Sequence, residues 1–204
     1  MTQDAAFDLG KVGYAGAMAA AEGWATLLNK GKQYPYEEVE AAFHDYAARA
    51  NMNDWPHWCD IFTEECLYVD HHFGVFRTRA EIAKWMVPLM SRQSEMRFVP
   101  GWHAIKGNLV MNYNWNRWPN PEGSRVPYGE FRNPGPVDDY KYQFPCMTLN
   151  IYGGNGKFCY EEDLLNMAHV MEDVRESGFR FSPQTGAPPK NPNRDFSRPP
   201  QARR

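Results

Sequence analysis

Apolar residues recur at helical spacing in the first half of the chain and alternate with polar residues in much of the second half. Between residues 36 and 50 this spacing places Val39, Phe43 and Tyr46 on one side of a helix. We therefore expect that helix to pack against a core through its aromatic side.

Two further helices are predicted before residue 93. Residues 54–62 (DWPHWCDIF) form a short, Trp-rich helix with a proline in its first turn. Thr78 is expected to cap a third helix over residues 79–92, because Glu81 stands three residues later, as a capping box requires. Pro88 is expected to kink or end this helix.

The remaining segments are typical of strands. Turns are expected at Lys106–Asn108 and at Gly153–Gly156, each between two alternating segments, and these predict two antiparallel hairpins. A last helix is expected over residues 167–176. The predicted strand segments are residues 66–73, 75–78, 96–105, 108–118, 142–152 and 157–167. This order predicts an α+β fold with helices on one face of a curved sheet.

Three regions are expected along the chain: an N-terminal arm over residues 1–34, one α+β domain over residues 35–180, and a tail over residues 181–204. The tail is too polar and Pro-rich to build a core, and we expect it to be flexible or to wrap a neighbouring subunit. A Pro- and Gly-rich segment over residues 119–136 is a candidate lid.

Composition narrows the function. The net charge of −3 shows no basic excess, which argues against nucleic-acid binding. The four cysteines form no CxxC pair, as expected for reduced residues of a cytoplasmic protein. We expect no membrane segment. A hydrophobic fraction of 43%, with 15% aromatic residues, is enough to form a core that also encloses an apolar cavity.

Several motifs resemble those of one fold family. They are the spacing W-x-x-W-x-x-x-F-x-x-x-x-x-x-x-D that ends at Asp70, the helix RAEIAKWM, the turn W-H-x-I-x-G-N-x-V and the segment GGNGKFCYEED. Together they resemble the SnoaL-like and ketosteroid-isomerase-like group of the nuclear-transport-factor-2-like superfamily, over residues 36–176. The resemblance implies a cone-shaped, mostly antiparallel sheet, closed by three N-terminal helices around a deep apolar pocket, often in a homodimer or homotrimer. It leaves the reaction open, because this superfamily includes several enzyme classes and non-catalytic proteins.

The resemblance also implies catalytic positions. Aligned on ketosteroid isomerases, Asp70 takes the place of the base and Tyr46 that of the oxyanion donor. The second donor of those enzymes, a protonated Asp, falls near Thr148, a departure that puts the isomerase reaction in doubt. Asp70 has a second interpretation from the residues alone, as a strand-end carboxylate that caps a turn.

Three histidines are candidate proton carriers near neutral pH. In a regular strand His72 shares a face with Asp70 and His71 points to the other side, whereas a bulge would reverse this. His103 follows in the next hairpin. Asp70, His72 and His103 could form a two-His-one-carboxylate metal site; we expect neither a metal nor another cofactor, since the superfamily usually works without one.

Further side chains are candidates for binding a substrate. Asn112, Asn114 and Asn116 share one face of their strand, and we expect at least two of them to face solvent. Glu162 shares a face with Tyr160, and if buried it would supply a second acid. Arg97 shares a face with His103 if the strand is regular. The candidate substrate-binding residues are Trp55, Trp58, Arg97, Asn114, Thr148 and Glu162.

These observations favour a cofactor-independent lyase that acts by acid/base chemistry on a bulky aromatic small molecule. Dehydration and retro-aldol cleavage both suit such residues, and one candidate reaction is formaldehyde release from a lignin-derived diarylpropane diol. Asp70, Tyr46, His72, His103 and His71 are the candidate catalytic residues. The alternatives are a ketosteroid-type double-bond isomerase and a non-catalytic ligand-binding or assembly domain.

Overall fold

The computed structural model describes residue 19, residues 21–119 and residues 140–180. An unlabelled helix over residues 21–28 comes first. The elements that follow are α3 (Tyr36–Ala50), α4 (Trp55–Cys59), β1 (Phe62–Asp70), β2 (Gly74–Phe76), α5 (Arg79–Met90), β3 (Arg97–Lys106), β4 (Leu109–Pro119), β5 (Tyr140–Gly154), β6 (Lys157–Leu164) and α6 (Met167–Ser177).

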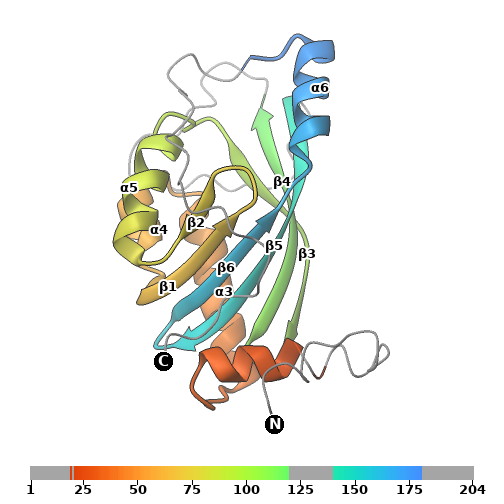
Figure 1. Cartoon of the computed structure of the whole chain (residues 1–204). Helices are drawn as coiled ribbons and strands as arrows, with labels where there is room; N and C mark the ends of the chain where they lie inside the picture. The colour runs from red at the N-terminus through yellow and green to blue at the C-terminus, as the bar shows by residue number, and fades with distance from the viewer. Residues whose placement is uncertain (1–18, 20, 120–139, 181–204) are drawn as a thin grey trace.

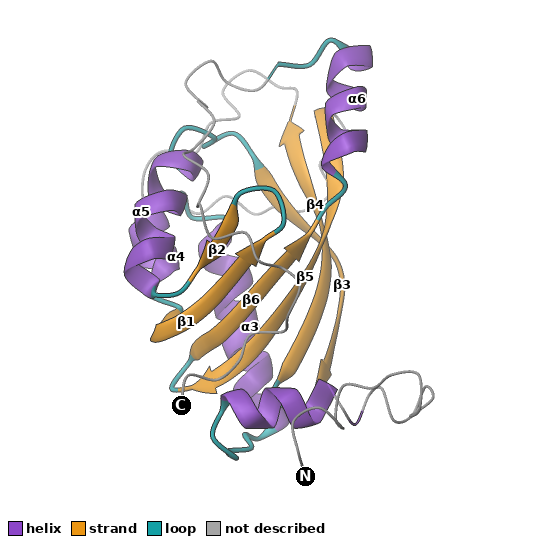
Figure 2. Ribbon diagram, in the orientation of Figure 1, coloured by secondary structure: helices purple, strands orange, loops and turns teal. Residues whose placement is uncertain are grey.

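The six strands form one sheet in the order β2-β1-β6-β5-β4-β3 (Figure 1). Only the β1–β6 pair is parallel, and every other neighbouring pair is antiparallel. The sheet is not closed, since β2 and β3 are its two edges. Helices α3, α4 and α5 cover its concave side (Figure 2). The predicted α+β class, with three helices packed against a curved, mostly antiparallel sheet, is confirmed.

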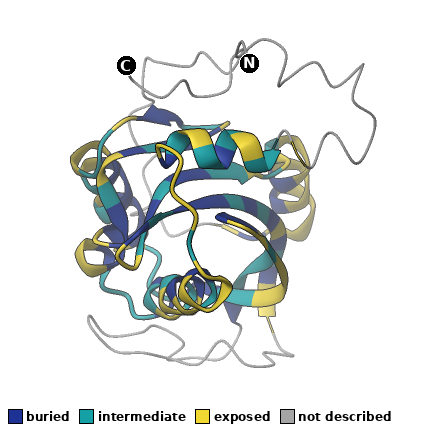
Figure 3. Ribbon diagram, turned by 90° about the horizontal axis from the view of Figure 1, so that it is seen from below, coloured by how far each residue is buried: buried dark blue, intermediate teal, exposed yellow. Residues whose placement is uncertain are grey.

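The core lies between these helices and the sheet. Val39 of α3 and Ile82 of α5 are completely buried, as are Phe62 of β1 and Phe158 of β6. Exposed parts of the ribbon lie on the outer sides of the helices and along much of the edge strand β3, whereas the inner strands carry most of the buried parts (Figure 3). The apolar stripe of α3 therefore faces the sheet, as its spacing predicts.

The helix over residues 21–28 packs on the opposite, outer face of the sheet. Ala25 is buried there, and the Trp24 ring packs edge-on against the Tyr160 ring at 4.9 Å between centroids. The Asn29 side chain donates a 2.7 Å hydrogen bond to the carbonyl of Tyr152. Part of the predicted arm is therefore joined to the sheet.

Helix α5 begins at the predicted cap. The Thr78 hydroxyl accepts a 3.2 Å hydrogen bond from the Glu81 N–H, and the Glu81 carboxylate accepts one from the N–H of Arg77. The helix continues through Pro88 and ends at Met90. Pro88 thus does not end the helix.

Two β-bulges set the direction of the side chains that follow them. In β3 the partner of Pro100 is Asn114 and that of Trp102 is Tyr113, so Gly101 is an extra residue. In β6 the partners of Phe158 and Tyr160 are consecutive residues of β5, so Cys159 is an extra residue too. Each extra residue reverses the alternation of inward and outward side chains along its strand.

Several expectations lie outside the described residues. These are the lid over residues 119–136, apart from Pro119 at the end of β4, the tail over residues 181–204, and the first part of the arm. The oligomeric state and the division into three regions stay predictions. Within the described residues, no helix combines the length and the apolar character needed to cross a bilayer.

Candidate active site

A cavity of about 650 Å³ lies between the three helices and the concave face of the sheet. Its walls are mainly apolar. Phe43 and Tyr46 line it from α3, Trp58 from α4, and Trp85 and Met86 from α5. A pocket of this size, with few polar groups, suits a bulky apolar molecule.

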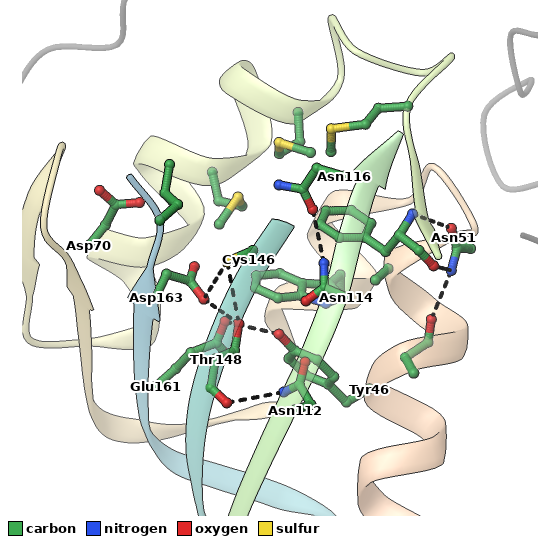
Figure 4. Close-up of a pocket in the computed structure, with 18 of the residues that line it drawn as sticks. Tyr46, Asn51, Asp70, Asn112, Asn114, Asn116, Cys146, Thr148, Glu161 and Asp163 are labelled. Carbon is green, nitrogen blue, oxygen red and sulfur yellow. Dashed lines mark hydrogen bonds between the residues drawn. The ribbon is translucent and has the colours of Figure 1, made fainter. Parts of the chain in front are cut away.

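A row of polar side chains crosses the sheet on the pocket side. Register pairs Asp70 with Asp163, Asp163 with Thr148, Thr148 with Asn112, and Asn112 with His103. All five side chains line the cavity. Because directly paired residues of adjacent strands point to the same face, one row brings together residues from five strands. Figure 4 shows four members of this row, Asp70, Asp163, Thr148 and Asn112.

Asp163 lies near the middle of the row and is held by hydroxyl groups. The Thr148 hydroxyl donates a 2.6 Å hydrogen bond to one carboxylate oxygen, and the Tyr68 hydroxyl donates a short one to the other. Burial, and secondly the negative charge of Asp70, raise the pKa of Asp163 to about 6. This carboxyl group can therefore gain and lose a proton near neutral pH.

Glu161 is a second carboxyl group on the same face, two residues before Asp163 on β6. It is 1% exposed. Tyr46 donates a 3.0 Å hydrogen bond to one of its oxygens, and Asn150 donates a 2.7 Å hydrogen bond to the other. Burial, followed by repulsion from Asp163, raises the pKa of Glu161 well above its ordinary value. Burial likewise raises the pKa of the Tyr46 hydroxyl, so this pair keeps its protons to higher pH than an exposed pair would.

Asp70 has features of both interpretations. One carboxylate oxygen accepts hydrogen bonds from the N–H groups of His72 (2.7 Å) and Phe73 (2.6 Å), so the side chain caps the turn after β1. Asp70 also lines the pocket. Burial raises its pKa, although these two backbone hydrogen bonds and the nearby histidines act in the opposite direction. Its role as a base stays a prediction.

The histidines divide between two sides of the sheet. His72 and His103 line the pocket. His71 instead pairs with Glu162, with 2.7 Å between its Nε2 and a carboxylate oxygen. His71 and His72 lie in the turn that follows β1 rather than in a regular strand. The turn directs His72 toward the pocket and His71 toward Glu162, which is the same separation that alternation along a regular strand predicts.

Two substrate-binding candidates do not line the pocket, and the bulges explain both corrections. In β6 the bulge at Cys159 turns Glu161 and Asp163 inward and Glu162 outward, where Glu162 accepts a hydrogen bond from Tyr160. In β3 the bulge at Gly101 places Phe98 and Pro100, not Arg97, on the face of His103. The buried Arg97 guanidinium donates hydrogen bonds to three backbone carbonyl groups, those of residues 94–96.

The asparagines of β4 require a further correction. Asn112, Asn114 and Asn116 all line the pocket, whereas we expected at least two of them to face solvent. Asn112 donates to the side chain of Asn150 at 3.1 Å, and Asn114 donates to Asn116 at 2.9 Å. These mutual hydrogen bonds reduce the cost of placing amides inside a pocket. The other substrate-binding candidates, Trp55, Trp58 and Thr148, also line it.

Sequence reasoning missed two carboxyl groups, Glu161 and Asp163. Phe158 faces inward, so regular alternation along β6 would place Tyr160 and Glu162 inward as well. The bulge at Cys159 places Glu161 and Asp163 inward instead. Gly153, an unpaired residue of β5 that lies against Cys159, is the available signal: a Cβ there would lie 3.0 Å from the Cβ of Cys159. A glycine inside a strand often marks such an irregularity.

A different group of side chains has the composition of a metal site. The ligand atoms of Glu40, His44 and His103 lie within 4.8 Å of one another. The set differs from the one considered from sequence, because it pairs His103 with two residues of α3 instead of Asp70 and His72.

Comparisons with known proteins identify the fold. No family model matches the sequence, and no curated protein matches it significantly. A candidate polyketide cyclase from Xanthomonas campestris matches with a TM-score of 0.50 and 14% identity, over 68% of this chain and 97% of that chain. A candidate SnoaL-like polyketide cyclase from Jannaschia sp. CCS1 matches with a TM-score of 0.50 and 12% identity, over 74% of this chain and 100% of that chain.

These identities concern the fold alone. The expected resemblance is confirmed at that level: the chain has the nuclear-transport-factor-2-like fold of SnoaL-like and ketosteroid-isomerase-like proteins. That fold carries many activities, so the function has to be argued from the pocket itself.

Proposed function

We propose that this protein is an enzyme that acts by acid/base chemistry on a bulky aromatic small molecule, and specifically a cofactor-independent lyase. The observation that carries the proposal is the pair of inward carboxyl groups on β6. Asp163, with a pKa of about 6, is mostly ionised at neutral pH, whereas burial favours the protonated form of Glu161. Two neighbouring carboxyl groups with separated pKa values are suited to the roles of base and acid.

The reaction has two parts when the substrate is a diarylpropane diol. Asp163 takes the proton of the primary hydroxyl, the adjacent C–C bond breaks, and formaldehyde leaves. The electron pair of that bond forms a C=C bond while the secondary hydroxyl departs as water, with a proton from the Tyr46–Glu161 pair. The products are formaldehyde, water and a diarylethene, and one proton has moved from the acid to the base. Simple dehydration uses the same two groups.

The described pocket gives less support to the two alternatives. A double-bond isomerase would use Asp70 as its shuttle, and one oxygen of Asp70 is occupied by two backbone N–H groups. A non-catalytic domain predicts a pocket filled by side chains, with the conspicuous polar residues in water. Here Asp70, Thr148 and Asn114 line an open cavity instead.

The test is turnover by the full chain with a panel of diarylpropane diols, steroid enones and polyketide-like phenols. The protein is treated with a metal chelator before the reaction, and the products are identified by mass spectrometry. Loss of water, or of water and formaldehyde, from a diol would support the lyase. An enone isomer of unchanged mass would show an isomerase and overturn the proposal. A complete absence of turnover and binding across the panel would overturn it too.

Variants assign the roles once a substrate is found. We expect Asp163→Asn and Tyr46→Phe each to lower kcat by about 10²- to 10⁴-fold, the usual contribution of a positioned acid or base. Wild-type kcat/KM, which reports groups of the free enzyme, should rise with pH through about 6 as Asp163 ionises. Glu162→Gln is the matched control, because Glu162 lies on the same strand but outside the pocket. Equal losses in the Glu162 and Asp163 variants would contradict the assignment.

A further inference from the structure

The exposed end of the polar row carries a second group of side chains that the proposed reaction does not use. His103 lies at this end, on the edge strand β3, and α3 packs against that strand. Glu40 and His44 are four residues apart on α3, so their side chains share one face of the helix. Helix and strand thus direct two imidazoles and a carboxylate to the same place.

The geometry fits a metal ion with small adjustments. The ligand atoms of the three side chains all lie within 4.8 Å of one another. Zinc binds nitrogen and oxygen at about 2.0–2.2 Å, so these atoms would have to move somewhat closer together to share one ion.

Neighbouring aromatic groups already orient the potential ligands. The Tyr36 hydroxyl donates a 2.8 Å hydrogen bond to one oxygen of Glu40, which leaves the second oxygen to bind a metal. The Phe43 ring packs 4.7 Å from the His103 ring, and the His44 and His103 rings meet edge-on at 5.8 Å. Outer contacts of this kind hold metal ligands in place.

We propose that Glu40, His44 and His103 bind a divalent transition-metal ion of the zinc class. Imidazole and carboxylate ligands select zinc, cobalt, nickel or copper over magnesium and calcium, which prefer oxygen ligands alone. Three protein ligands leave at least one coordination position. His44 and His103 line the pocket, so an oxygen atom of a bound ligand can occupy that position.

This site is independent of the proposed lyase reaction. Asp163 is on β6, three strands away from His103 on β3. If the chain binds no metal, the acid/base proposal is unaffected. If the chelator-treated chain turns over no substrate, the proposed metal site is unaffected. Among the described residues, no other group of His, Cys, Asp and Glu side chains meets the same distance condition.

The test is calorimetric titration of the chelator-treated full chain with zinc and with cobalt, together with the visible spectrum of the cobalt complex. We expect one ion per chain. His44→Gln and His103→Gln should weaken binding more strongly than Tyr36→Phe, for which about a 10-fold loss is expected. His169→Gln, an exposed histidine on α6, is the control and should bind as the wild type does. Circular dichroism checks that each variant is folded.

Two results would overturn the metal site. One is the absence of saturable binding at micromolar zinc or cobalt. The other is binding that His44→Gln and His103→Gln leave unchanged, because the ion would then lie elsewhere. Magnesium is included as a hard cation, and an affinity equal to that for zinc would also argue against imidazole ligands.

Discussion

Glu161 and Asp163 lie on the same strand, but the residues around them give the two carboxyl groups different pKa values. Glu161 is enclosed by Tyr46 and Asn150, whereas Asp163 accepts hydrogen bonds from two hydroxyl groups beside the open pocket. Both lose hydration, and burial is the largest cause of each raised pKa. The hydroxyl groups favour the charged form of Asp163 and hold its pKa at about 6. Glu161 also accepts hydrogen bonds that favour its charged form, but burial and the negative charge of Asp163 outweigh them and raise its pKa well above the ordinary value.

The raised pKa of Asp163 predicts a pH-dependent stability. The native state holds this proton up to about pH 6, whereas the unfolded chain loses it near the ordinary value of 3.8. Between these values the native state binds more protons, so the free energy of unfolding falls as pH rises. This difference in pKa corresponds to roughly 3 kcal/mol of unfolding free energy, which is lost progressively as pH rises from 3.8 to about 6.

Replacement of Asp163 by Asn tests this, because Asn resembles the neutral acid. We expect equal unfolding free energies for Asp163→Asn and the wild type near pH 4, and a more stable variant at pH 8, by up to about 3 kcal/mol. Urea unfolding at several pH values measures the difference. Glu162→Gln should show no such gain at pH 8. A constant difference between Asp163→Asn and the wild type at all pH values would contradict the predicted titration.

At the scale of elements, single extra residues decide which side chains reach the pocket. The bulge at Gly101 turns His103 inward after Trp102, and the bulge at Cys159 does the same for Glu161 after Tyr160. The glycine in β3 has a steric reason. A Cβ at Gly101 would lie 2.8 Å from the carbonyl oxygen of Tyr113, a backbone atom that has little room to move.

Gly101→Ala should therefore disturb the bulge. We expect a loss of about 1–3 kcal/mol of unfolding free energy, the usual cost of overpacking. Gly23→Ala is the matched control, because a Cβ at this position in the N-terminal helix meets no atom within 4 Å. There the same substitution should raise stability by about 0.5–1 kcal/mol, since alanine favours a helix. Thermal unfolding measures both, and effects of the same sign would contradict the steric explanation.

At the scale of the molecule, the pocket exists because the curved sheet and three helices enclose more space than their side chains fill. Five of the seven tryptophans line it: Trp55, Trp58, Trp85, Trp102 and Trp118. Trp24 packs on the outer face of the sheet instead. Most of the tryptophan side chains therefore border the cavity.

An aromatic ligand in the pocket should change tryptophan emission in a saturable way. We expect Trp24→Phe to keep the amplitude of the change, whereas Trp58→Phe should reduce it. The same ligand should raise the melting temperature, because binding to the native state alone adds about 2.7 kcal/mol at one hundred times Kd. Stabilisation by a ligand that left the emission unchanged would place its site outside this cavity.

The sequence by itself determined the elements and the fold. Helix spacing, the Thr78 cap and the glycine-containing turns depend on contacts within a few residues, and their predictions agree with the structure. The motif from Trp55 to Asp70, together with the other motifs that resemble SnoaL-like proteins, pointed to the correct fold. Asp70 and Tyr46 were singled out through the resemblance to ketosteroid isomerases, and His72 and His103 through their places on the predicted strands. All four line the pocket.

Only the tertiary structure decided which polar side chains meet. Strand alternation has a period of two, so one extra residue exchanges the two faces of everything beyond it. Glu161 and Asp163 rather than Glu162, and Phe98 rather than Arg97, face the cavity for that reason. The pairing of His103 with His44 likewise depends on how α3 packs across β3. Gly101 and Gly153 are local signs of the two irregularities, but they do not show which side chains meet across the sheet.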